Sequence, residues 1–126
     1  MAKHTVKWSS RPAKDDLLAA RRYLTLLFRD SDAKRLAERA RTAGITEHVA
    51  KDLLRACRLP LLPSDEKHVA QDLKRIRKGK PLSPILVVQG DLARGRPLVI
   101  ADGYHRMCAA CHADEDAPVS TVLIRP

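Results

Sequence analysis

Hydrophobic positions recur at helical spacing through the first half of the chain. Over residues 15–29, apolar side chains fall three or four positions apart with arginines between them. Ser31 and Asp32 are typical of a helix start, and the pattern that follows predicts a second helix over residues 33–43. A third helix is predicted over residues 46–58 by the same spacing. We therefore expect residues 1–58 to form an N-terminal helical region.

The second half of the chain alternates between helical and strand patterns. A connector with two prolines, residues 59–63, separates it from the first half. Short apolar runs bounded by Gly and Pro predict strands, and longer periodic segments predict helices. The predicted order is a helix over 66–78, strands over 84–88 and 98–101, a helix over 104–113 and a strand over 119–124. This order indicates an α+β fold with a small mixed sheet over residues 59–126, on which the first 58 residues pack as part of one compact unit.

The charge balance favours a negatively charged partner. The 126 residues carry a formal net charge of +9, and residues 1–58 hold 14 Lys and Arg against 7 Asp and Glu. Such a surplus suits nucleic acid or nucleotides, although solvated helix faces would produce the same balance. Aromatic residues make up only 3% of the chain, which argues against a stacking platform for single-stranded nucleic acid.

The sequence also limits the compartment. No apolar run approaches the roughly 20 residues that span a bilayer, and the first residues lack the apolar core of a signal peptide. An odd number of cysteines, three, fits a reducing compartment better than a disulfide framework. We expect a cytoplasmic protein without a membrane partner.

The strand-to-helix junction around Asp102 carries the most specific chemistry. An apolar run over 98–101 is broken by Asp102 and Gly103, and an alanine-rich helix follows. The first N–H groups of such a helix, with the positive end of its dipole, attract anions. His105 and Arg106 lie in this first turn, where a cation costs roughly 0.3–1 kcal/mol unless a negative group is close. Asp102 can supply part of that compensation, by capping the helix or pairing with Arg106, and a bound phosphate would supply more.

The junction also carries a family resemblance. A helix ending Lys-Arg-Ile-Arg-Lys-Gly79, the stretch Pro-Leu-Ser-Pro-Ile-Leu-Val-Val88, the stretch Asp-Gly-Tyr-His-Arg-Met-Cys-Ala-Ala110 and a closing apolar strand follow in that order. From about residue 59 to 124 the chain resembles the superfamily shared by sulfiredoxin and the N-terminal domain of the partition protein ParB. The resemblance implies a ParB/sulfiredoxin-like fold that binds the phosphates of a nucleotide, ATP or CTP, with or without Mg²⁺.

The same resemblance implies which residues form the site. The phosphate pocket would consist of Gly103, Tyr104, His105 and Arg106, with Lys67, His68, Gln71 and Arg75 contributed by the preceding helix. Asp102 and Glu66 are the candidates for a catalytic base or a magnesium ligand in a phosphotransferase, nucleotide hydrolase or nuclease. Tyr104 stands where sulfiredoxin has its nucleophilic cysteine, and we therefore do not expect sulfiredoxin activity.

A second interpretation places DNA on the first half. Residues 36–54 have the spacing of a helix-turn-helix, whose second helix would present His48, Lys51 and Arg55 to a groove. An ordinary helical hairpin needs the same small and apolar residues. The segment around Trp8 is compatible with a terminal strand or a contact in a homodimer.

Cys108-Ala-Ala-Cys111-His112 matches the attachment pattern for covalent haem. The motif falls on the predicted helix after the junction, where both cysteines would lie on one face as small buried residues. Zinc would need a fourth ligand, and Cys57 is the only other cysteine. We expect core packing here, with neither haem nor a metal centre.

Overall fold

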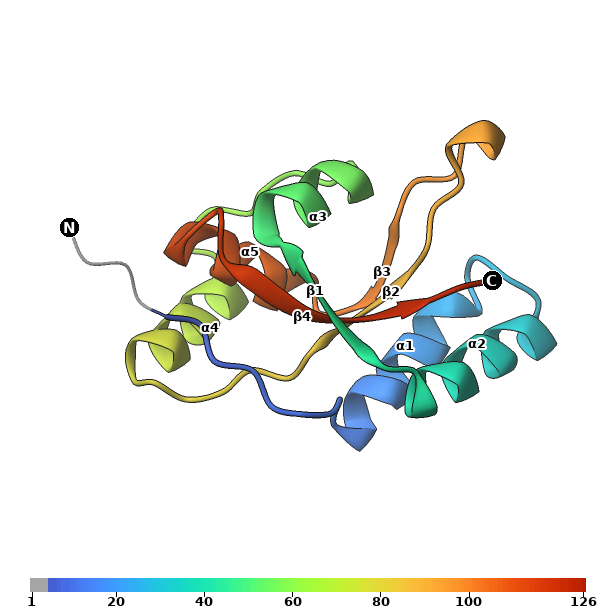
Figure 1. Ribbon diagram of the computed structural model, residues 1–126, viewed down its shortest axis with the longest axis horizontal. Helices are drawn as coiled ribbons and strands as arrows, with labels where there is room; N and C mark the ends of the chain where they lie inside the picture. The colour runs from blue at the N-terminus through green and yellow to red at the C-terminus, as the bar shows by residue number, and fades with distance from the viewer. Residues whose placement is uncertain (1–4) are drawn as a thin grey trace.

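The computed structural model describes residues 5–126, which form three layers, with a mixed sheet between two groups of helices (Figure 1). This arrangement confirms the predicted α+β fold with a small mixed sheet. The elements in chain order are α1 (Lys14–Leu24), α2 (Asp30–Thr42), β1 (Ile45–Val49), α3 (Ala50–Cys57), α4 (Lys67–Arg77), β2 (Ile85–Val88), the 3₁₀ turn η1 (Leu92–Arg94), β3 (Val99–Asp102), α5 (Tyr104–Ala113) and β4 (Pro118–Ile124).

The strand order in the sheet is β1-β4-β2-β3. β4 pairs in parallel with β2 and antiparallel with β1, and β2 pairs antiparallel with β3. All four residues of β2 are buried, because helices cover both faces of the sheet. Ile85 and Val87 face a core shared with α3, α4 and α5, whereas Leu86 and Val88 face a core shared with α1 and α2.

The main difference from the sequence prediction lies in residues 46–58. The first part of this predicted helix is instead the edge strand β1, in which Ile45 pairs with Val122 of β4, and α3 begins only at Ala50. Ile45, Thr46 and Val49 are β-branched, and such residues favour strands when a sheet edge can accept their backbone hydrogen bonds. The predicted helix-turn-helix geometry is therefore wrong, and residues 1–58 contribute a strand to the same sheet as the second half.

Other boundaries differ less. α1 ends at Leu24, four or five residues before the predicted end, because the chain turns there and leaves Leu26 and Leu27 exposed. α5 has the predicted bounds, Tyr104–Ala113, and β4 begins one residue earlier than predicted. Trp8 forms an isolated parallel bridge with Leu82.

The cysteine motif lies on α5 and faces the core. Cys108 and Cys111 are buried, and Cys57 on α3 is buried in the same core cluster. Burial raises the pKa of all three thiols, which keeps them protonated at neutral pH. Within residues 5–126, no helix combines the length and the apolar content that crossing a membrane requires.

Candidate anion-binding site

The predicted anion site lies at the corner formed by residues 102–106, where β3 turns into α5. Gly103 is the N-cap of α5 and adopts φ 106° and ψ 18°, a conformation that favours glycine. A Cβ atom at this position would lie 2.6 Å from Cγ2 of Ile85. The corner therefore requires glycine both for its backbone angles and for its close packing on β2.

The first turn of α5 has free backbone donors. Gly103 offers no side chain to cap the helix. Within residues 5–126, the N–H groups of Tyr104, His105 and Arg106 donate no hydrogen bond, and the first capped group is the N–H of Met107, which donates to the Gly103 carbonyl. These three donors and the positive end of the helix dipole are the features that bind anions at other helix starts.

Arg106 is largely occupied by the protein itself. Its Nε donates to the Ser83 carbonyl at 2.9 Å, and its Nη2 donates to the Pro84 carbonyl at 3.2 Å and to the Asp102 carboxylate at 3.0 Å. Nη1 lies 3.8 Å from the Asp16 carboxylate on α1, and only 17% of the side chain is exposed. Arg106 thus ties α5 to β3, to α1 and to the segment before β2.

Burial raises the pKa of the Asp102 carboxyl, and the neighbouring Asp16 raises it further, whereas Arg106 lowers it. The desolvation of this carboxylate is therefore compensated only in part by its ion pair. Asp102 serves the corner as the partner of Arg106 and as one wall of a pocket.

A polar pocket of about 220 Å³ opens between α4 and the corner. The rings of His68 and His105 lie 4.8 Å apart, from centroid to centroid, at this boundary. Burial raises the pKa of Asp72, against the lowering influence of Arg106 and His105. The residues that line the pocket are His68, Gln71, Asp72, Asp102, Gly103, His105 and Arg106.

Glu66 caps α4 and lies just outside this pocket. Its Oε2 accepts hydrogen bonds from the backbone N–H groups of His68 at 3.0 Å and Val69 at 2.9 Å, and it lies 3.9 Å from Nε2 of His105. The bond from Val69, followed by that from His68, lowers the pKa of this carboxyl. A carboxylate that is held in its charged form by a helix start is a poor proton acceptor, so capping explains Glu66 better than catalysis.

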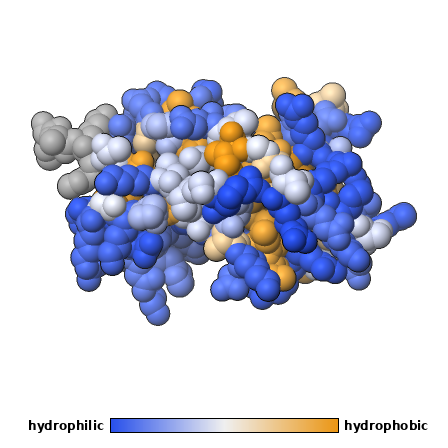
Figure 2. Space-filling view, turned by 60° about the horizontal axis from the view of Figure 1, so that its bottom comes forward, coloured by the Kyte–Doolittle hydropathy of each residue, from blue (hydrophilic) through white to orange (hydrophobic). Residues whose placement is uncertain are grey.

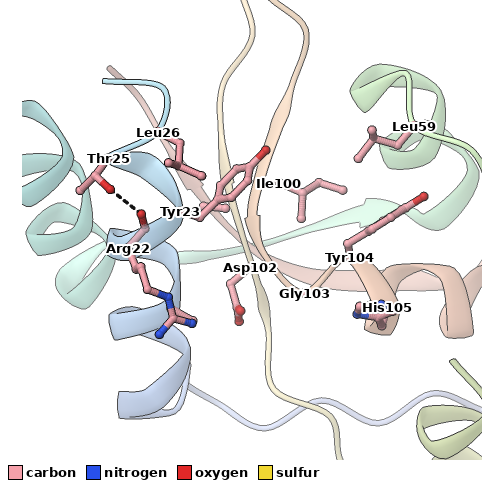
Figure 3. Close-up of a pocket in the computed structure, with 12 residues that line it drawn as sticks. Arg22, Tyr23, Thr25, Leu26, Leu59, Ile100, Asp102, Gly103, Tyr104 and His105 are labelled. Atoms are coloured by element: carbon pink, nitrogen blue, oxygen red, sulfur yellow. Dashed lines mark hydrogen bonds between the residues drawn. The ribbon is translucent and has the colours of Figure 1, made fainter. Parts of the chain in front are cut away.

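A second, more apolar pocket of about 580 Å³ adjoins the first on the side of α1 (Figure 3). Tyr23 from α1 and Tyr104 from α5 lie on either side of Ile100, and the Tyr104 hydroxyl donates to the Pro60 carbonyl. Leu26 and Leu59 also line this pocket. Asp102, Gly103 and His105 line both pockets, so that the corner separates a polar compartment from an apolar one.

The apolar pocket belongs to a wider group of exposed hydrophobic side chains. Figure 2 shows apolar residues as an interrupted band on a face that is otherwise largely hydrophilic. Tyr23, Leu26 and Leu59 are exposed although they are large and apolar. Side chains of this kind at a pocket are typical of ligand sites.

The structure gathers most, but not all, of the predicted site residues. Lys67 begins α4 as an exposed residue, and Arg75 donates to the Pro81 carbonyl at 3.0 Å; neither lines the pockets at the corner. Asp72 was missed, although it follows His68 by one helical turn and so shares its face. Tyr23 was missed because nothing in the sequence links α1 to a corner about eighty residues away.

The three residues predicted to contact DNA lie apart from any recognition helix. His48 is on β1, with Nε2 at 2.9 Å from the Thr46 hydroxyl. Lys51 pairs with Asp116 at 2.6 Å, and Arg55 pairs with Asp52 at 3.3 Å.

In the part of the chain that the structure describes, no group of three or more His, Cys, Asp or Glu side chains is placed to hold a metal ion. No family model, curated protein or solved structure matches the chain. The resemblance to the ParB/sulfiredoxin superfamily therefore depends on the quoted motifs alone.

Proposed function

We propose that this protein binds a nucleotide or a related phosphate ligand at the corner between β3 and α5. The observation that carries the proposal is the position of three uncapped N–H groups beside two adjoining pockets, one polar and one apolar. A nucleotide has the same division, since its phosphates are charged and its base is flat and largely apolar.

The phosphate would occupy the polar pocket. The N–H groups of residues 104–106 would hold its oxygens, and the side chains of His68, Gln71 and His105 can donate further hydrogen bonds from the pocket wall. Arg106 has a positioning role in this proposal, because most of its donors already bind Asp102 and backbone carbonyls.

Asp72 and Asp102 bear on the form of the ligand. Two carboxylates beside a bare polyphosphate would repel it, whereas Mg²⁺ is commonly bound by one or two carboxylates together with phosphate oxygens. We therefore propose that the nucleotide binds as its magnesium complex, with Asp72 as the protein ligand least occupied by other contacts.

The base would occupy the apolar pocket. Tyr23 and Tyr104 offer two aromatic rings beside Ile100, and Leu26 and Leu59 complete an apolar lining. The bond from Tyr104 to the Pro60 carbonyl fixes one ring in advance, which reduces the ordering cost of binding. The proposal concerns binding, and it assigns no reaction to the site.

Calorimetric titration with ATP, CTP and GTP, each with Mg²⁺ or with EDTA, tests the proposal. We expect saturable binding of at least one nucleotide at or below millimolar concentration, weakened by His105→Ala and by Tyr23→Ala. His48→Ala is the matched control, because it removes a histidine on β1 that lies outside both pockets. Absence of binding at millimolar nucleotide, or equal weakening by His48→Ala, contradicts the proposal.

A further inference from the structure

A second surface with a distinct composition lies at the opposite end of the sheet from α4. The hairpin that joins β2 to β3 extends beyond the helical layers, with η1 at its tip (Figure 1). Five arginines from three parts of the chain line two hollows along this hairpin, and we call them the arginine surface: Arg55, Arg58, Arg94, Arg96 and Arg125. We propose that the arginine surface binds the phosphate backbone of duplex nucleic acid.

The hairpin is built to hold its shape. Asp91 and Arg96 exchange backbone hydrogen bonds of 2.8 and 2.9 Å, and Gly95 takes the left-handed conformation that closes the tip. A Cβ atom at Gly90 would lie 2.7 Å from the Pro97 backbone, so the two arms approach as closely as glycine allows. The N–H of Leu98 donates to the Ala56 carbonyl at 3.2 Å, which fixes the base of the hairpin against α3.

The two hollows have volumes of about 580 and 330 Å³ and share Gly90, Leu92 and Arg96. Asp91 is the single acidic residue among those that line them. Arg94 lies 3.5 Å from Asp91 and is 80% exposed, and Arg55 is 85% exposed. Contacts of such exposed pairs are weak and yield readily to a stronger anion.

Arg96 connects the two hollows and has an unsatisfied donor. Its Nε is shielded from solvent and has no hydrogen-bond partner within residues 5–126. A buried donor without a partner is costly, and an oxygen of a bound ligand would satisfy it. Arg96 therefore gives the arginine surface an observation independent of its net charge.

Three features favour duplex nucleic acid as the partner. All five cations are arginines, whose planar group binds phosphate oxygens in pairs. The hollows have no aromatic side chain on which the bases of a single strand would stack. Leu92 is 83% exposed at the tip of a narrow β-ribbon, a shape that fits a duplex groove.

This surface is independent of the nucleotide site, because no residue lines both the hairpin hollows and the pockets at the corner. It also replaces the helix-turn-helix as the place where DNA would be bound. Of the three residues once assigned to that motif, only Arg55 belongs to the arginine surface.

The test is fluorescence anisotropy with a labelled DNA duplex of about 30 base pairs, over roughly 50–200 mM salt, where counterion release is readily measured. The triple variant Arg55→Gln, Arg58→Gln, Arg94→Gln removes three cations of the surface. The matched control, Lys74→Gln, Arg77→Gln, Lys78→Gln, removes three exposed cations from the end of α4. Circular dichroism establishes that both variants fold, and Arg94→Gln alone replaces the triple variant if that does not.

We expect the parent to bind the duplex with a steep dependence on salt. The logarithmic salt slope should become shallower by about 0.9 for each arginine removed, or roughly 2–3 for the triple variant, and should stay unchanged in the control. The proposal is overturned if the parent does not bind the duplex, if the control loses as much as the triple variant, or if a poly-glutamate peptide of equal charge binds more tightly than the duplex.

Discussion

Replacing Arg106 with alanine removes the side chain that holds the corner together. Three hydrogen bonds are lost, to the carbonyls of Ser83 and Pro84 and to the Asp102 carboxylate. The variant also leaves Asp102 and Asp16 facing each other without their shared cation. Removing one partner of a buried ion pair costs about 3–5 kcal/mol, and slight exposure of this pair places the expected loss at about 3 kcal/mol.

The loss should depend on pH in a defined direction. Without Arg106, the influence that lowers the pKa of Asp102 is absent, and the carboxyl takes up a proton at higher pH in the folded protein. A carboxyl whose folded pKa is raised destabilises the fold as pH rises from its unfolded value, near 3.8, through the raised value. The difference between variant and parent should therefore be smallest in acid and grow towards neutral pH.

Urea unfolding of the parent, Arg106→Ala, Asp102→Asn and the double variant measures these terms as a double-mutant cycle. We expect Asp102→Asn to restore part of the stability lost in Arg106→Ala, because it removes the stranded charge. An unchanged free energy of unfolding for Arg106→Ala, combined with abolished nucleotide binding, would refute the assignment. Arg106 would then be a ligand-binding cation and not a positioning residue.

Three further predictions concern the corner, its neighbouring helix and the core. Gly103→Ala should lower the free energy of unfolding by about 2–4 kcal/mol in urea titrations, because it combines left-handed strain with a 2.6 Å contact to Ile85; an unchanged value would show that the corner can relax. Glu66 has a lowered pKa, so its capping contribution is present above about pH 4.5 and lost as pH falls through the folded value. Unfolding of the parent and of Glu66→Gln should therefore converge in acid, and parallel pH profiles would contradict the cap. The three cysteines should react with a thiol reagent slowly in the native protein at neutral pH and rapidly in denaturant; rapid native labelling would contradict their burial.

Local patterns predicted the second half of the fold well. The run of residues 84–88 is buried on both faces, and α5 follows a glycine that only a sharp turn requires. These signals are short-range, since they depend on periodicity and on residues that break it. β1 was missed because its edge position is fixed by β4, more than seventy residues away, and a tertiary contact of this kind overrides a helical spacing.

The candidate site divides in the same way. The corner, with Gly103 and His105, was visible in the sequence as a strand, a glycine and a helix start. The apolar pocket was not, because Tyr23 and Leu59 meet Tyr104 only when α1 packs beside β3. The sequence left open whether Arg106 faces a ligand or Asp102, and the three-dimensional contacts favour Asp102.

The most direct measurement of the central claim is an amide spectrum of isotopically labelled protein during titration with ATP, CTP and GTP in the presence of Mg²⁺. We predict that the amide signals of Tyr104, His105 and Arg106 shift most and saturate together, while those of the hairpin tip, residues 92–96, stay in place. Unshifted signals for these three amides at millimolar nucleotide, or shifts confined to the hairpin, would contradict the account.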